Sequence, residues 1–248
     1  MKRYSIAIDG PSGSGKSTLA KRLAERLGFL YLDTGAIYRA VGIYAHRAGV
    51  DLEDEQAVEA LLPRLAKISF RHENGEQRVF LGEEDVSDAI RMPEVSLFAS
   101  QVAAHQAVRD FLLDMQQAFA ETHDVVMDGR DIGTVVLPHA SLKVFLTATA
   151  ERRAERRYQE LRSRGVDETY EQVLEDIKAR DERDTQRDVS PLQQAEDAIV
   201  LDTTELNLDE SLEALVRLSE ARLGSRTSFL GKIMRALLGR WTEARLRG

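Results

Sequence analysis

A glycine-rich segment near the start of the chain contains the residue types that hold phosphate groups. It matches the pattern G-x-x-x-x-G-K-[ST] and lies between a short apolar run and a helical pattern. The glycines of such a loop let backbone N–H groups turn toward phosphate oxygens, at the positive end of the following helix. The lysine adds a positive charge beside the β- and γ-phosphates, and the last hydroxyl is a ligand for Mg²⁺. The loop consists of Gly10, Pro11, Ser12, Gly13, Ser14, Gly15, Lys16 and Ser17.

Polar residues follow four of the short apolar runs that are expected to form strands. Because ligands of open α/β sheets bind outside the carboxyl ends of the strands, these residues are expected at one edge of a sheet. A carboxylate beside the phosphate loop would orient the water shell of Mg²⁺, and Asp128 and Asp33 compete for this role. The alternative for either residue is a turn or a helix N-cap. The polar strand ends are Asp9-Gly10, Asp33-Thr34-Gly35, Asp128-Gly129-Arg130-Asp131 and Asp202-Thr203-Thr204.

Arginines are concentrated in two segments and indicate the class of reaction. Residues 151–165 contain six arginines, and residues 180–187 contain three more. Arg180, Asp184 and Arg187 are spaced so that a helix would place them on one stripe. The alternative for both segments is a solvated helix whose salt bridges contribute little. Transfer of a γ-phosphoryl group onto a second phosphate brings anions together, and arginines stabilise that arrangement.

A kinase whose acceptor is itself a phosphate fits this pattern. Such an acceptor is already ionised, so no catalytic histidine is needed, and the five histidines are expected at the surface. A GTPase would need fewer arginines and a base-reading N-K-x-D motif, which the sequence lacks.

The hydrophobic pattern predicts the elements that must position these residues. Short apolar strands alternate with helices, which indicates an α/β fold with a parallel sheet covered on both faces. Thr34 is expected to be the N-cap of the second helix. Residues 51–93 interrupt the alternation with an acidic helix and two strands joined at Asn74-Gly75, which predicts an insert. The five strands are expected at about 4–9, 29–32, 124–127, 142–146 and 198–201, and the helices at about 17–27, 35–48, 94–104, 107–122, 150–164, 170–187 and 209–223.

Several blocks of the sequence together resemble those of bacterial cytidylate kinases, which are nucleoside monophosphate kinases. The resemblance covers about residues 1–223 and implies the three-layer P-loop NTPase fold with a five-stranded parallel sheet. It further implies a kinase domain over 1–224, with an acceptor-binding insert at about 51–93 and a helical lid at about 150–166. The blocks are IDGPSGSGKST at 8–18, LDTGAIYRA at 32–40, SQVAA at 100–104, DGRDIGTVV at 128–136 and RDERDTQR at 180–187.

The resemblance implies ATP-dependent phosphorylation of CMP and dCMP to CDP and dCDP, with Mg²⁺ bound to ATP. Residues 10–18, now including Thr18, would hold the ATP phosphates, and Ser17 would contact the metal directly. Two alternatives stay open: a kinase that also uses UMP, and a nucleotide sensor without turnover. The expected catalytic residues are Lys16, Arg130, Arg156, Arg157 and Arg187. The expected acceptor-site residues are Thr34, then Ser100, Arg109 and Asp131 at the cytosine, Arg39, Arg130 and Arg187 at the phosphate, and Arg180 and Asp184 at the ribose.

The cytosine residues that the resemblance implies have the right chemistry for that base. A carboxylate or hydroxyl accepts a hydrogen bond from the exocyclic N4 amine, and an arginine donates to N3 and O2. Uracil has an oxygen in place of the amine and would leave the acceptor unpaired.

Composition and charge exclude several classes of protein. The chain has 248 residues and a net charge of −8. It contains no cysteine, which excludes a disulfide scaffold and thiolate chemistry. It has neither an apolar run long enough to span a membrane nor an N-terminal leader, so a cytoplasmic enzyme is expected.

The last 24 residues differ from the rest of the chain. Residues 225–248 carry a charge of +5, which leaves −13 on the remainder and argues against broad nucleic-acid binding. This tail is expected to form a basic amphipathic helix. It would dock on its own chain, on a partner or on an anionic membrane surface.

Overall fold

A computed structural model describes residues 3–65, 67–73, 76–92 and 94–224. Five parallel strands form its central sheet in the order β2-β6-β1-β7-β8. The phosphate-binding loop of residues 10–17, called the P-loop below, therefore follows the central strand, because β1 pairs with β6 on one side and with β7 on the other. The strands are β1 (Ser5–Asp9), β2 (Leu30–Asp33), β6 (Val125–Gly129), β7 (Leu142–Thr147) and β8 (Ile199–Asp202).

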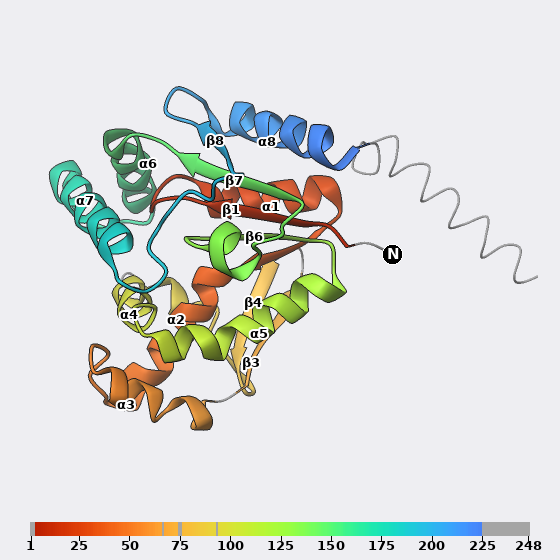
Figure 1. The fold of residues 1–248 in the computed structure, drawn as a ribbon. Coiled ribbons are helices and arrows are strands. Elements are labelled where there is room, and N and C mark those ends of the chain that lie inside the picture. The colour runs from red at the N-terminus through yellow and green to blue at the C-terminus, as the bar shows by residue number, and fades with distance from the viewer. Residues whose placement is uncertain (1–2, 66, 74–75, 93, 225–248) are drawn as a thin grey trace, which may run out of the picture.

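Helices cover both faces of this sheet, which confirms the predicted three-layer α/β fold (Figure 1). One apolar cluster joins the sheet to α1 (Lys16–Leu27) and α8 (Leu208–Leu223). A second cluster joins the opposite face to α2 (Thr34–Arg47), α4 (Val95–Val102) and α5 (Gln106–Thr122). The two remaining long helices, α6 (Ala150–Ser163) and α7 (Tyr170–Gln186), pack against each other through a third cluster.

Strand register explains which strand residues face which layer. Ile6 lies opposite Val126 and Leu142, and all three belong to the α1 and α8 cluster. Side chains alternate along a strand, so the next residue, Ala7, faces the α2 and α5 cluster together with Met127. The continuous apolar runs of the sequence thus fill two cores at once.

The described residues between 51 and 92 contain helical turns and a small sheet separate from the central one. They include α3 (Glu55–Glu59), two short 3-10 turns at Leu62–Arg64 and Ala89–Arg91, and an antiparallel sheet. Two strands were expected, and the structure adds a third, because the chain turns back after Gly82. The expected turn at Asn74-Gly75 lies outside the described residues. The strands are β3 (Ile68–Glu73), β4 (Glu76–Leu81) and β5 (Glu84–Asp85).

Three expectations about individual residues are wrong. Asp33, not Thr34, caps α2, because its carboxylate accepts from the Ala36 N–H at 2.9 Å and the helix begins at Thr34 itself. His105 is buried rather than exposed, and its Nε2 lies 2.8 Å from the Leu52 carbonyl oxygen. Arg187 follows the end of α7 in extended conformation, so it does not continue the helical stripe of Arg180 and Asp184. The tail, residues 225–248, lies outside the described residues.

Gly10 provides a test of how tightly the P-loop is packed. A Cβ at this position would overlap the Leu146 carbonyl oxygen of β7. We expect Gly10→Ala to lower the unfolding free energy by about 3 kcal/mol, because neither strand can move aside. Gly49→Ala is the control, since Gly49 also has a positive φ of 74° but no atom near its Cβ position. Thermal melts followed by circular dichroism should show the larger loss for Gly10→Ala, and equal losses would contradict this packing argument.

Candidate active site

The polar strand ends gather at one edge of the sheet, as the sequence predicts. Asp33 and Asp128 are register partners on adjacent strands, and Asp9 is the register partner of Gly129. Asp128 lies opposite Ile8 of the α1 layer, so its side chain points toward the first turn of α1. Asp9 points the other way, toward the segment that follows β6.

The P-loop places a buried cation at this edge. Gly15 caps α1 in the left-handed conformation with φ of 85°, and the helix begins at Lys16. Lys16 is only 8% exposed, and its Nζ donates to the Pro11 carbonyl oxygen at 3.2 Å. Burial, together with the positive charge of Arg130, lowers the pKa of Lys16 to about 7. An anion bound here would restore the favourable surroundings that the ammonium group lacks.

Of the two carboxylates that compete to orient a metal, Asp128 has the suitable position. Ser17 Oγ donates to its Oδ2 at 2.7 Å, and the Tyr31 hydroxyl donates to its Oδ1 at 2.8 Å. Burial raises the pKa of Asp128 to about 6, with a further contribution from the negative charge of Asp33. Asp33 is occupied otherwise: besides capping α2, it accepts from Arg39 Nη2 at 3.0 Å.

The donor set around Ser17 fits Mg²⁺. A hydroxyl and a carboxylate lie in contact, and oxygen atoms are the ligands that this ion prefers. Within the described part of the chain, no three metal-ligating side chains cluster.

Three arginines, Arg130, Arg180 and Arg187, lie beside Asp184, and Arg39 lies near Arg180. Arg130 Nε donates to Asp184 Oδ2 at 2.6 Å, and Arg187 Nε donates to the Ser190 carbonyl oxygen at 2.7 Å. Burial lowers the pKa of Arg180 to about 10, and the charges of Arg130 and Arg39 lower it further. Burial also lowers the pKa of Arg187.

Two of these arginines carry buried N–H groups without a partner. They are Arg180 Nε and Arg187 Nη2, and the loss of water around such groups costs about 1–3 kcal/mol each. Like charges at close quarters and unpaired donors together indicate that an anion completes this cluster.

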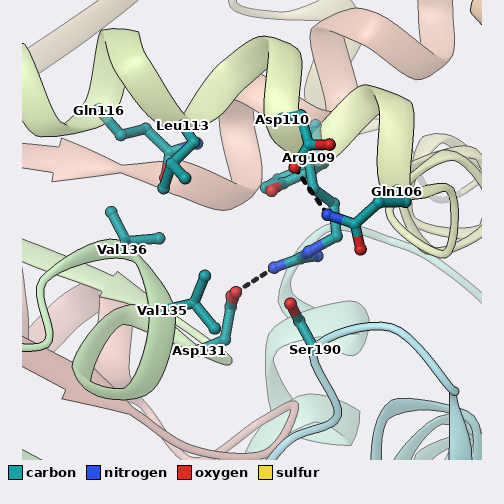
Figure 2. A pocket seen from close by; sticks show the side chains of 10 residues that line it. Gln106, Arg109, Asp110, Leu113, Gln116, Asp131, Val135, Val136 and Ser190 are labelled. Atoms are coloured by element: carbon teal, nitrogen blue, oxygen red, sulfur yellow. Dashed lines mark hydrogen bonds and ion pairs between the residues drawn. The ribbon is translucent and has the colours of Figure 1, made fainter.

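Two of the three residues expected at the cytosine, Arg109 and Asp131, line a small cavity (Figure 2). Arg109, on α5, forms a buried ion pair with Asp131, which comes from the segment after β6. Its guanidinium also lies 5.4 Å from the centre of the Tyr38 ring and donates to the Ala103 carbonyl oxygen. The cavity has a volume of about 20 Å³. Ser100 lies half-buried on α4 and is not among the residues that line it.

Three further expected residues form contacts elsewhere. Thr34 is buried, and its hydroxyl donates to the Asp128 carbonyl oxygen at 2.7 Å. Arg156 donates to the Thr203 carbonyl oxygen at 2.6 Å and to that of Leu206 at 3.2 Å. Arg157 pairs with Glu160 at 2.9 Å. Among the described residues, neither Arg156 nor Arg157 forms a hydrogen bond to the P-loop.

The structure brings Tyr31 and Arg153 to the site, which the sequence reasoning did not assign to it, and gives a role to Asp9, which was expected only as a polar strand end. Asp9 accepts from the N–H groups of Ile132 at 2.8 Å and Gly133 at 2.7 Å, which fixes the segment carrying Asp131. Tyr31 holds Asp128, as described above. Arg153, on α6, contacts the P-loop through the Ser12 carbonyl oxygen at 2.9 Å. The position of Asp9 at a strand end was a usable signal, whereas nothing distinguished Arg153 from its five arginine neighbours.

Comparisons with known proteins agree on one family. The cytidylate kinase family model matches residues 6–221. A cytidylate kinase from an Exiguobacterium species is 52% identical over 219 residues, covering 88% of this chain and 97% of the relative. The cytidylate kinase of Caldicellulosiruptor bescii is 49% identical over 218 residues, covering 88% of this chain and 96% of the relative.

Solved structures show likeness in the fold alone. An uncharacterized protein from Eubacterium ventriosum has a TM-score of 0.50 at 16% identity, covering 89% of this chain and all of that one. The family model and the identity over most of both chains show that this chain belongs to the cytidylate kinase family of phosphotransferases.

Proposed function

We propose that the chain transfers the γ-phosphoryl group of ATP to the phosphate of CMP or dCMP, giving ADP and CDP or dCDP. The observation that carries this proposal is the cluster of Arg180 and Arg187, buried with unpaired N–H groups beside the cation of Lys16. One anion at the P-loop and a second at the arginines would satisfy both groups. The names of the relatives supply the base, because they are cytidylate kinases.

The ATP phosphates would lie in the loop of residues 10–18, at the start of α1. Ser17 would bind Mg²⁺ directly, and Asp128 would orient the ion through water. When bound, Mg²⁺ neutralises charge on the β- and γ-phosphates. Lys16 would stabilise the charge that moves onto the β–γ bridging oxygen as its bond to the γ-phosphorus breaks.

The acceptor phosphate would lie among Arg39, Arg130 and Arg187, with Arg180 and Asp184 at the ribose. An oxygen of this phosphate attacks the γ-phosphorus, and because it is already ionised, no side chain has to remove a proton. Arg156 and Arg157 would leave their present partners when the lid closes over the transferring group.

The cytosine would be read by Arg109 and Asp131, with Ser100 reached as the insert closes. In this structure the two charged residues pair with each other, so each has its hydrogen-bonding group in place before the base arrives. We further propose that the reaction serves pyrimidine nucleotide metabolism in the cytoplasm. Among the described residues, no helix is long and apolar enough to cross a membrane.

An ADP-release assay with four acceptors tests the proposal. With ATP and Mg²⁺ present, we expect CMP and dCMP to give rapid ADP release, UMP to give much less, and AMP to give none above background. Comparable rates with CMP and UMP would support the alternative of a dual-specificity kinase. If no acceptor raised ADP release above the ATPase background, the kinase proposal would be wrong and a nucleotide sensor would remain.

A further inference from the structure

Arg153 is a buried arginine that joins three elements of the site. It lies on α6 and is 5% exposed. Its Nε donates to the Ala148 carbonyl oxygen at 2.9 Å, at the end of β7. The other end of the guanidinium donates to the Ser12 carbonyl oxygen at 2.9 Å and forms a two-pronged pair with Asp181 at 3.0 and 2.5 Å. The planar fork of arginine suits this set of partners, which the point charge of a lysine cannot reproduce.

The contact with Ser12 constrains the P-loop backbone. The C=O of Ser12 and the N–H of Gly13 belong to one peptide unit and, in a trans peptide, point in opposite directions. By holding this carbonyl oxygen, Arg153 turns the Gly13 N–H away from α6. The two segments are packed closely, because a Cβ on Gly13 would lie 3.2 Å from the Arg153 Cβ. The loop cannot rotate this peptide without breaking the hydrogen bond from Arg153.

The contact with Asp181 reaches the acceptor side of the site. Asp181 follows Arg180 on α7 and lies three residues before Asp184, which pairs with Arg130. Arg180 and Asp184 are the residues that would contact the ribose. The buried Arg153 guanidinium therefore links α7 to the P-loop by hydrogen bonds, beside the apolar packing of Ile177 near Gly13.

We propose that Arg153 is a positioning residue that couples ATP binding to acceptor binding, which rests on the proposed function. It sets the Gly13 peptide for the ATP phosphates and, through Asp181, holds α7 in the position that binds the acceptor. When phosphates fill the P-loop, the Ser12 peptide is held in place, and so is the Arg153 side chain that donates to it. Arg153 then holds Asp181, and with it α7, in the position that binds the acceptor. CMP should bind more tightly when the P-loop is filled, and ATP should bind more tightly when CMP is present, by the same factor.

Calorimetric titration of the full chain tests this coupling. The affinity for CMP is measured with and without a non-hydrolysable ATP analogue and Mg²⁺, and the ratio of the two affinities is the coupling factor. We expect a factor of about 5 or more in the wild-type chain, and a factor near 1 in Arg153→Lys and in Asp181→Asn. Glu182→Gln is the matched control, because Glu182 is the exposed neighbour of Asp181 and should keep the wild-type factor.

Two results of these titrations would contradict the coupling role of Arg153. If Arg153→Lys and Asp181→Asn showed the same coupling factor as Glu182→Gln, the proposal would be overturned. Lower melting temperatures of these two variants would not rescue it, because a purely structural role of Arg153 predicts a loss of stability with unchanged coupling. A wild-type factor of 1 would overturn it as well. Asp181→Asn keeps the test decisive if Arg153→Lys fails to fold. The Asp181 side chain is 24% exposed, so its replacement disturbs the packing less. A wild-type chain that binds both ligands but releases no ADP would contradict the proposed function instead.

Discussion

Replacement of Lys16 by alanine should lower kcat for CMP phosphorylation by about a hundredfold to a thousandfold while the protein stays folded. Lys16 is the cation nearest the phosphate loop, and it is held almost out of water. A charge in such surroundings stabilises a developing negative charge far better than an exposed one does. Its Nζ donates to the Pro11 carbonyl oxygen rather than to a carboxylate, so its removal breaks no hydrogen-bonded ion pair among the described residues, although the buried Asp128 loses a favourable positive charge nearby.

Steady-state kinetics and a circular dichroism melt of the same preparation would check this prediction. Lys178→Ala is the matched control: Lys178 is 57% exposed on α7 and lies 3.8 Å from Glu151. That variant should keep kcat close to the wild-type value. If Lys16→Ala retained kcat within about threefold of wild type, Lys16 would not be the phosphate-binding cation.

Asp131→Ala should erode the preference for CMP over UMP by at least about tenfold. Its carboxylate is the group that would accept from the cytosine amine, and uracil offers no donor at that position. The variant should also lose about 3–5 kcal/mol of stability, because Arg109 remains buried without its partner. Assays therefore need a temperature well below the lowered melting point.

A second variant separates base reading from phosphate binding. Arg187→Ala should lower turnover with CMP and with UMP alike, because both substrates carry the same phosphate. The measurement is kcat/KM for each acceptor with each variant. Equal losses on CMP and UMP in Asp131→Ala would remove Asp131 from base reading.

The fold was largely predictable because its signals are local. Each strand of the central sheet is a short apolar run, and each expected strand overlaps an observed one. The polar residues at Asp9, Asp33 and Asp128 follow those runs directly, so their meeting at one sheet edge follows from parallel pairing alone. The P-loop needed only its own residues and the two elements beside it.

What the sequence could not predict depends on contacts between distant segments. Asp33 and Thr34 are both good N-cap residues, and the end of β2 decides between them by pairing with β6. Among the six arginines of residues 151–165, burial against Ser12 selects Arg153, and that burial exists only in the folded chain. The mutual pairing of Arg109 and Asp131 likewise joins residues that are 22 positions apart.

The strand order of the central sheet has a consequence for how the chain is made. β1 has both of its neighbours late in the sequence, since Ser5 pairs with Val125 and Ile6 with Leu142. A ribosome that adds about 5–20 residues per second needs about 6–24 s to deliver the first of these partners. During that interval Ile6 and Ile8, which are fully buried in the finished protein, have no sheet to join. Of the five strands of the central sheet, the strand that leads into the P-loop is therefore synthesised first, yet it pairs only after both of its neighbours have been made.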